Sequence, residues 1–223
     1  MTPFRFIPRN IQFMLLITLC SVTYTKFVNA ENLHQKAELL AKAGDITGMG
    51  DTYLKILKDT PSGDLKAQLG YATAQSWQGH HEVAQDQFRQ VLKQQPDNLD
   101  ALIGLGYDFA WSRQFKEAES QFNKVLVIVP DNVSAQKGLA FSSLWNEQPQ
   151  KALDIFQSLE KQHPNDAEIF AAEGQALLAL NNKEEATIAF QRALIITPGR
   201  PDAIDGLATI NKNKKTFDFV AWA

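Results

Sequence analysis

Apolar residues recur at intervals of three and four along most of the chain after residue 64, and short polar or glycine-bearing stretches interrupt them. The clearest stretch is residues 99–132, where one run holds Leu102, Leu105 and Phe109, and the next holds Phe115, Ala118, Phe122 and Val125. This spacing places apolar side chains on one face of an α-helix. The pattern therefore predicts pairs of amphipathic helices joined by short links.

The same residue types return every 34 positions. The four series are Ala84, Ala118, Ala152 and Ala186; Phe88, Phe122, Phe156 and Phe190; Pro96, Pro130, Pro164 and Pro198; and Trp77, Trp111 and Trp145. Aligned series of this kind indicate an internal repeat of one helical hairpin. A single hairpin cannot bury its apolar face, so successive hairpins must stack on one another.

This period resembles the tetratricopeptide repeat (TPR) family, and residues 99–132 match its pattern with Leu102, Leu105, Gly106, Phe109, Ala118, Phe122 and Pro130. The resemblance implies an all-α, right-handed solenoid of antiparallel helical hairpins. We expect clear units at 65–98, 99–132, 133–166 and 167–200. Residues 31–64 read as a degenerate unit, with Ala37, Tyr53 and Ile56 in the core roles, and residues 201–223 as a capping helix and tail.

Residues 1–30 have the features of a signal peptide. Arg5 and Arg9 precede an apolar stretch at residues 11–23, and a small residue, Ala30, ends a plausible cleavage site. The apolar stretch is too short to span a membrane, and bulky Leu19 argues against lipid attachment at Cys20. We therefore expect an exported protein, periplasmic or secreted, with no transmembrane anchor after cleavage.

Charge and cysteine content exclude several functions. Residues 1–30 hold three of the 22 basic residues and none of the 25 acidic ones, which leaves the remainder with 19 basic and 25 acidic residues. An acidic balance argues against nucleic-acid binding. Cys20 is the only cysteine and lies in the predicted signal peptide, so neither a disulfide nor a thiolate metal site is expected.

The tryptophans lie opposite the predicted buried stripe. On a helical projection Trp111 falls near Asp100, Gly104 and Tyr107, and nearly opposite Leu102. In the TPR family this side of the first helix lines the concave groove. The candidate binding groove comprises Trp77, Tyr107, Trp111, Phe141, Trp145, Gly70, Gly104, Gly138 and Lys137. Its rim holds the charged residues Lys66, Asp100, Lys137 and Glu168.

Two interpretations of this stripe stay open. A glycine stands seven residues before each tryptophan, although glycine inside a helix costs about 1 kcal/mol relative to alanine. Either an aromatic ring of a neighbouring unit packs over each glycine, or the glycines floor a groove walled by aromatic residues. The first interpretation makes the tryptophans packing elements, and the second makes them a binding site.

No motif indicates catalysis, and no cofactor or metal site is expected. His80 and His81 lie in a predicted link, while His34 and His163 lie near unit ends, so all four read as surface residues. The sequence predicts a non-catalytic scaffold of the bacterial cell envelope that binds an extended peptide or helix of a protein partner. The alternative is a glycan-binding module, because the repeats also resemble the periplasmic TPR portions of exopolysaccharide and cellulose export proteins. The tail after Lys212 is expected either to fold back on the last helix or to dock on another protein.

Overall fold

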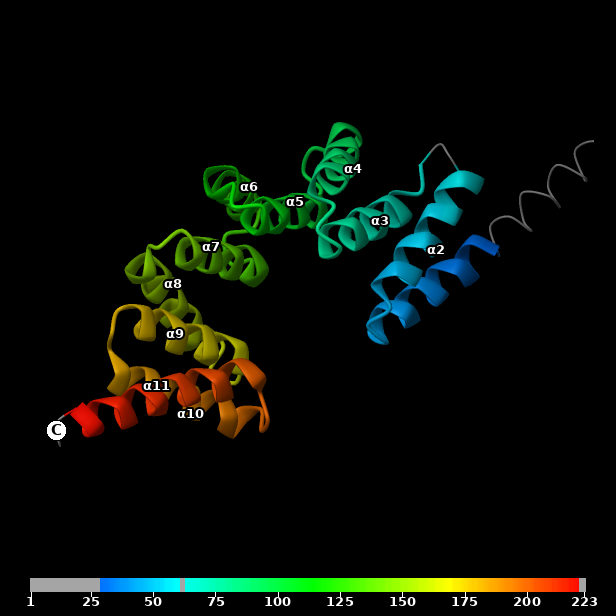
Figure 1. Cartoon of the computed structure of the whole chain (residues 1–223). Helices are drawn as coiled ribbons and strands as arrows, with labels where there is room; N and C mark the ends of the chain where they lie inside the picture. Colours follow the sequence, from blue (N-terminus) through cyan, green and yellow to red (C-terminus); the bar gives the residue numbers. More distant parts are fainter. Residues whose placement is uncertain (1–28, 61–62, 221–223) are drawn as a thin grey trace, which may run out of the picture. The chain divides into compact units, whose positions relative to one another are not determined.

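The computed structural model describes residues 29–60 and 63–220, with side chains up to Lys212. Every regular element in these ranges is an α-helix (Figure 1). The predicted signal peptide lies outside the described residues apart from Asn29 and Ala30, which are helical. Within the described part of the chain, no helix is long and apolar enough to cross a membrane.

The chain divides into two compact units, residues 1–91 and 92–223. The first unit contains a helix at residues 29–42, α2 (Ile46–Asp59), α3 (Leu65–Trp77) and most of α4 (His81–Gln94). The second contains α5 (Leu99–Trp111), α6 (Phe115–Ile128), α7 (Val133–Trp145), α8 (Pro149–Gln162), α9 (Ala167–Ala179), α10 (Lys183–Ile196) and α11 (Pro201–Val220).

Capping residues set where the first helix of each hairpin begins. Helices α3, α5, α7 and α9 follow Asp64, Asn98, Asn132 and Asp166, whose side chains accept a hydrogen bond from a backbone N–H of the first turn. Such a bond satisfies a donor that the helix itself leaves unpaired. The links to the second helices turn through the left-handed conformation at Gly79, Arg113, Glu147 and Asn181.

The core of the first unit contains the residues expected in the degenerate unit. Ala37, Tyr53 and Ile56 are buried, and they pack with Ala67 and Ala74 of α3 in one apolar cluster. The match to the repeat pattern in residues 31–64 thus corresponds to side chains that join this region to α3.

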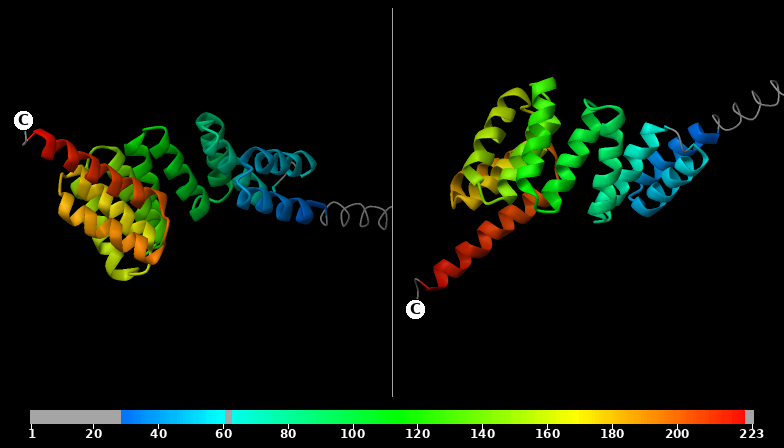
Figure 2. Two further views of the ribbon diagram at one scale, coloured as in Figure 1. Left: turned by 60° about the horizontal axis from the view of Figure 1, so that its bottom comes forward. Right: turned by 90° about the horizontal axis from the view of Figure 1, so that it is seen from above.

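In the second unit, each helix packs against its neighbours along the chain, from α5 with α6 through to α10 with α11. Contacts also join α5 to α7, α7 to α9, and α9 to α11. The first helices of the hairpins therefore form one continuous layer, and the second helices lie beside it (Figure 2). This all-α arrangement confirms the predicted fold class.

Phenylalanines of the second helices fill the spaces left by glycines of the first helices. A Cβ atom built on Gly106 would lie only 2.7 Å from the ring of Phe122, and one built on Gly138 of the next hairpin would also collide with that ring. Phe190 has the same relation to Gly174 and Gly206. One buried ring thus sets the spacing both within a hairpin and between hairpins.

The last helix is longer than predicted. The sequence predicts a capping helix that gives way to a tail after Lys212, whereas α11 continues as a helix to Val220. The backbone of residues 213–220 therefore does not fold back, and Trp222 lies outside the described residues. No residue between 201 and 220 is a glycine or proline placed to end the helix at residue 213, which explains the continuation.

Candidate functional site

The three repeated tryptophans end the first helices of their hairpins and remain about half exposed. The exposed fractions are 51% for Trp77 in α3, 42% for Trp111 in α5 and 39% for Trp145 in α7. Tryptophan is highly buried on average and is enriched at interfaces, so these three residues are candidates for contact with a partner. Trp77 belongs to the first unit, and Trp111 and Trp145 to the second.

In the second unit each exposed indole rests on the aromatic ring four residues earlier in its own helix. The ring centroids of Tyr107 and Trp111 are 5.8 Å apart with an interplanar angle of 30°. Those of Phe141 and Trp145 are 5.7 Å apart, at 24°. The structure thus brings four of the predicted site residues together as two ring pairs on adjacent helices that pack on one another.

Each ring pair is anchored in the core. The ring of Tyr107 meets buried Phe122 edge-on at 5.2 Å, and Phe141 meets buried Phe156 in the same way at 5.2 Å. Offset and edge-to-face contacts of this kind are the favourable geometries for aromatic rings. One face of each indole is therefore fixed by packing while another part stays accessible to solvent.

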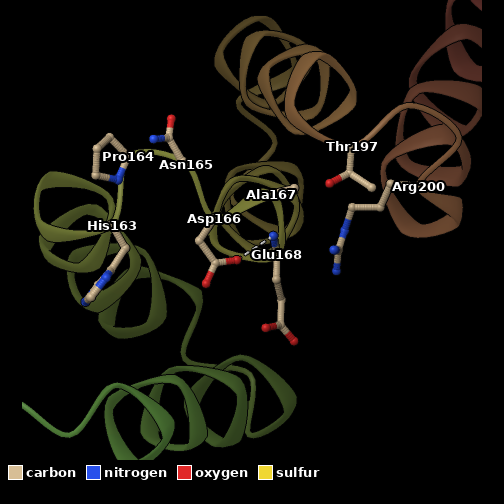
Figure 3. A pocket seen from close by; sticks show the side chains of 8 residues that line it. All are labelled: His163, Pro164, Asn165, Asp166, Ala167, Glu168, Thr197 and Arg200. Carbon is tan, nitrogen blue, oxygen red and sulfur yellow. Dashed lines mark hydrogen bonds between the residues drawn. The ribbon is translucent and has the colours of Figure 1, made fainter. Parts of the chain in front are cut away.

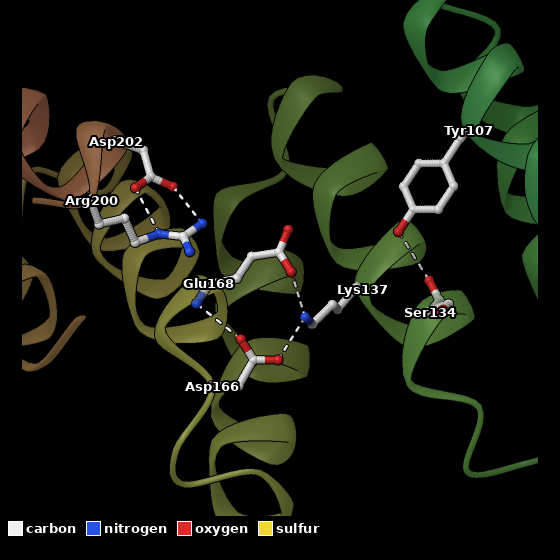
Figure 4. Close-up of polar contacts among 7 residues, drawn as sticks. All are labelled: Tyr107, Ser134, Lys137, Asp166, Glu168, Arg200 and Asp202. Carbon is white, nitrogen blue, oxygen red and sulfur yellow. Dashed lines mark hydrogen bonds and ion pairs between the residues drawn. The ribbon is translucent and has the colours of Figure 1, made fainter. Parts of the chain in front are cut away.

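Tyr107 also ties α5 to α7. Its hydroxyl donates a hydrogen bond to the backbone carbonyl of Ser134 at 3.1 Å (Figure 4). Burial, with a contribution from the charge of Glu168, raises the pKa of Tyr107 to about 12. The phenol therefore remains a neutral donor at physiological pH.

The glycines of the predicted groove have a packing role at two of three positions. The space beside Gly70 is occupied by the ring of Tyr53, and that beside Gly138 by Phe122. Both rings belong to the preceding hairpin, so an aromatic residue of a neighbouring unit, and not a ligand, explains these glycines. The third, Gly104, lies in α5 and is partly exposed.

Lys137 is engaged by the next hairpin. Its ammonium lies 2.7 Å from a carboxylate oxygen of Asp166 and also pairs with Glu168 (Figure 4). Burial alone would lower the pKa of Lys137, but the hydrogen bonds and charges of the two carboxylates raise it. Lys137 therefore ties α7 to the start of α9.

The two carboxylates that hold Lys137 have further roles at the start of α9. Asp166 is the N-cap of this helix and accepts a hydrogen bond from the backbone N–H of Glu168. The rim residue Lys66 is paired in a similar way, with Glu38 at 2.8 Å, although both side chains are well exposed. Sequence reasoning missed these pairs because they join residues about 30 positions apart.

A hollow of about 560 Å³ opens beside this ion cluster. Figure 3 places His163, Pro164 and Asn165 on one side and Thr197 and Arg200 on the other, with Asp166, Ala167 and Glu168 between them. Arg200 stands where the earlier first helices have an Asp or Asn cap, and it pairs with Asp202 at 2.8 Å. The 34-residue register of the sequence already places Arg200 at this cap position, 34 residues after Asp166.

His34 is not the surface residue that the sequence suggested. It is only 6% exposed, and its Nε2 atom lies 2.7 Å from the carboxylate of Asp64, the N-cap of α3. Its position near the end of a predicted unit suggested a surface site, whereas the helix at residues 29–42 turns it inward beside Tyr53. In contrast His80 is exposed, as expected of a residue in a link. Among the described residues there is no cluster of His, Cys, Asp or Glu arranged to bind a metal ion.

Comparisons with known proteins agree with this architecture. Two family models described as tetratricopeptide repeat match residues 72–133 and 112–175. A comparison with curated protein sequences gives no match.

Solved structures of repeat proteins are similar in fold. A tetratricopeptide repeat protein from Parabacteroides merdae superimposes with a TM-score of 0.74 at 16% identity, over 84% of this chain and 73% of that one. A thermophilic TPR protein from Thermus thermophilus gives 0.73 at 16% identity, over 81% and 98%. MamA from Desulfovibrio magneticus gives 0.60 at 16% identity, over 77% and 97%.

Stacked helical hairpins with an exposed aromatic layer define a helical-repeat protein of the kind that presents an extended surface to other molecules. Residues 72–175 are built of tetratricopeptide repeats. The fold is in general that of a protein–protein interaction scaffold.

Proposed function

We propose that the second unit binds an extended segment or helix of a partner protein on the surface formed by Tyr107, Trp111, Phe141 and Trp145. The observation that carries this proposal is the pair of exposed indoles, each packed on a ring that is itself anchored to a buried phenylalanine. Aromatic anchors dominate the energy of many interfaces. Because packing already restricts these rings, ordering them on binding costs little conformational entropy.

The surroundings of this surface favour a peptide over a charged polymer. Lys137 is neutralised by Asp166 and Glu168 within the protein, so it offers no free cation to a strongly acidic ligand. Affinity then comes from apolar and aromatic side chains of the partner, with backbone hydrogen bonds fixing its direction. Trp77 has the same place in its own hairpin and the largest exposed fraction of the three indoles, so we propose an equivalent contact on the first unit.

We further propose that this binding takes place outside the cytoplasm, in the cell envelope. The support for this location is the signal-peptide pattern of residues 1–30. Fractionation of cells that express the full chain, with mass spectrometry of its N-terminus, tests it. Recovery of the uncleaved chain from the cytoplasm would contradict the proposal.

The binding experiment starts from a peptide library displayed on phage and selected on the purified chain. The affinity of the best peptide is then measured by fluorescence anisotropy for the wild type, Trp111→Ala and Trp145→Ala. We expect each substitution to weaken binding by roughly 10-fold to 100-fold, as for other aromatic hot spots. The matched control is Val127→Ala in α6, because Val127 is also apolar and is 83% exposed.

A separate titration tests the glycan alternative. Soluble β-glucan oligomers are titrated against the chain while intrinsic tryptophan fluorescence is recorded. Indole faces also stack on sugar rings. A fluorescence response to glucans that Trp111→Ala removes, together with a failure to select any peptide, would mean that the ligand is a glycan and not a protein. Peptides that bind all variants equally would overturn the aromatic surface as the site.

A further inference from the structure

Basic residues are distributed unequally between the two layers of the second unit. Each of the second helices α6, α8 and α10 contains two basic and two acidic residues. The first helices α5, α7 and α9 contain one basic residue, Lys137, and four acidic ones, of which Asp100 and Glu168 reach solvent and Asp108 and Glu173 are buried. The layer that carries the proposed binding surface is therefore acidic, whereas the layer beside it is balanced.

The single basic residue of this layer is already compensated, with one carboxylate in excess. Lys137 pairs with both Asp166 and Glu168 (Figure 4), and two carboxylates around one ammonium leave one negative charge uncompensated. Glu168 bonds to Lys137 through Oε2, and its side chain is 44% exposed. Because a carboxylate can accept hydrogen bonds on both oxygens, Glu168 can bind a second cation from outside the protein.

The hollow of about 560 Å³ gives such a cation room beside Glu168. Arg200 lines another side of this hollow (Figure 3), and its guanidinium meets the carboxylate of Asp202 in two contacts of 2.8 and 2.9 Å. Paired guanidinium and carboxylate groups of this geometry satisfy one another. Since Lys137 and Arg200 are both engaged and one carboxylate is in excess, charge complementarity favours a cationic occupant over an anionic one.

The ion cluster adjoins the aromatic rings of the proposed binding surface. The hydroxyl of Tyr107 bonds to the carbonyl of Ser134, which lies one turn before Lys137 on α7. Figure 4 shows Tyr107, Lys137 and Glu168 in succession from α5 through α7 to α9. The charge of Glu168 is close enough to Tyr107 to contribute to the rise in the pKa of its phenol. A ligand that lies on the rings can therefore reach Glu168.

We propose that the partner segment carries a lysine or arginine whose charged group binds Glu168 at this hollow, while its apolar side chains pack on Trp111 and Trp145. This inference rests on the proposed function, because it assigns a charge to the ligand of the same surface. Lys137 and Trp145 are eight residues apart on α7, or about 12 Å at roughly 1.5 Å per residue. An extended chain covers about 3.3 Å per residue. The basic residue should therefore stand about three or four positions from the apolar residue on Trp145.

Lys137 competes with the cation of the ligand in this arrangement. When a basic residue binds Glu168, Lys137 keeps its contact of 2.7 Å with Asp166. Removing the Lys137 ammonium leaves both carboxylates to the ligand and should raise its affinity. An ion cluster that only stabilises the fold would instead lose affinity when either Lys137 or Glu168 is replaced. The two roles thus predict opposite results for the same substitution.

Peptides selected from a random library on the purified full chain serve as the probes. We expect lysine or arginine to be enriched three or four positions from an aromatic or large apolar residue. By fluorescence anisotropy, the best peptide should bind Glu168→Gln about 5-fold to 10-fold more weakly, because a charge-assisted contact is lost, and Lys137→Met about threefold more tightly. Glu184→Gln, which changes an exposed acid of α10, is the matched control and should bind as the wild type does.

A charge swap between peptide and protein tests the contact directly. Replacing the basic residue of the peptide by glutamate should weaken its binding to the wild type about 10-fold, and the altered peptide should bind Glu168→Lys better than it binds the wild type. Circular dichroism checks that each variant keeps its helix content.

Two results would overturn this inference and leave the proposed function in place. One is binding that depends on Trp111 but is equal in the wild type, Glu168→Gln and Glu168→Lys. The other is weaker binding in both Lys137→Met and Glu168→Gln, which would mean that the ion cluster only supports the fold. Failure to select any peptide whose binding depends on Trp111 would overturn the proposed function and this inference together.

Discussion

The ring of Phe122 occupies the space where a side chain at Gly138 would lie, so one residue of α6 fixes how closely α7 can approach. The same ring lies against Gly106 of its own hairpin. Glycine is retained inside these helices because close approach outweighs its unfavourable helix propensity. The contact also explains why a repeat that needs a large ring at one position needs a very small residue at another.

Gly138→Ala should destabilise the protein although alanine is the better helix former. The added Cβ would meet the buried ring of Phe122, and overpacking of this kind costs roughly 1–3 kcal/mol, against about 1 kcal/mol gained in propensity. Urea denaturation measures the difference. Phe122→Leu combined with Gly138→Ala should cost less than the sum of the two single changes, and strict additivity would contradict the contact.

Replacing an exposed tryptophan should affect stability much less than replacing a buried phenylalanine at the same layer. We expect Trp111→Ala to lower the free energy of unfolding by about 1–2 kcal/mol, because much of the indole already lies in solvent. Phe122→Ala should lower it by about 3–5 kcal/mol, because its ring is fully buried. Equal losses in thermal or urea unfolding would show that the indole is a core element and would remove the basis of the binding surface.

Lys137→Met should reduce stability at neutral pH and should make stability change less with pH in the acid range. Burial alone would raise the pKa of Asp166, but the hydrogen bond and charge of Lys137 bring it below its ordinary value. A lowered carboxyl pKa gives stability that is present above the unfolded pKa of about 4 and is lost as pH falls through the folded value.

We expect the Lys137→Met change to cost about 1–2 kcal/mol at pH 7, a modest figure because Glu168 is partly exposed. The variant should also lose less stability than the wild type between about pH 5 and pH 2. Urea melts over this range measure both effects. Lys116→Met, at an exposed site, is the control, and parallel pH profiles for the wild type and Lys137→Met would contradict the ion cluster.

The Tyr107 phenol should ionise at a higher pH than an ordinary tyrosine. Its pKa of about 12 means that the folded state favours the protonated phenol, so its contribution is intact below the unfolded pKa of about 10 and is lost as pH rises through the folded value. Absorbance at the phenolate band, compared between the wild type and Tyr107→Phe, isolates this titration. At pH 7 the variant should lose about 0.5–1.5 kcal/mol with the hydrogen bond to Ser134.

Glu173→Leu should stabilise the protein. Burial, with the charge of nearby Glu160, raises the pKa of Glu173, and Gln157 lies only at the limit of hydrogen bonding, at 3.5 Å. A raised folded pKa means that ionisation opposes folding, so the penalty appears above the unfolded pKa of about 4 and is complete above the folded value.

The Glu173→Leu gain should be about 1 kcal/mol at pH 7 and should shrink as the pH is lowered toward 4. Thermal unfolding at several pH values measures it. Glu184→Leu, on the exposed side of α10, is the comparison variant and should show no such gain. A loss of stability in Glu173→Leu at every pH would mean that the Glu173 carboxylate makes an interaction that stabilises the folded protein.

The sequence by itself determined the helical hairpins and their order. The spacing of Phe88, Phe122, Phe156 and Phe190 identifies the ring that each hairpin buries, and Asn98 and Asn132 mark where first helices begin. These features are local, because helix periodicity and capping act over a few residues. They also fixed the place of the tryptophans at the ends of the first helices.

Only the tertiary structure decided what the repeated residues touch. The partner of Gly138 is a ring 16 positions earlier, Lys137 is held by Asp166 and Glu168 from the next hairpin, and His34 is buried against Asp64. A pattern read along one helix gives the direction of a side chain but not the neighbour that occupies that direction. That neighbour depends on how closely adjacent hairpins pack, and the packing distance is set by the volumes of side chains far apart in the sequence.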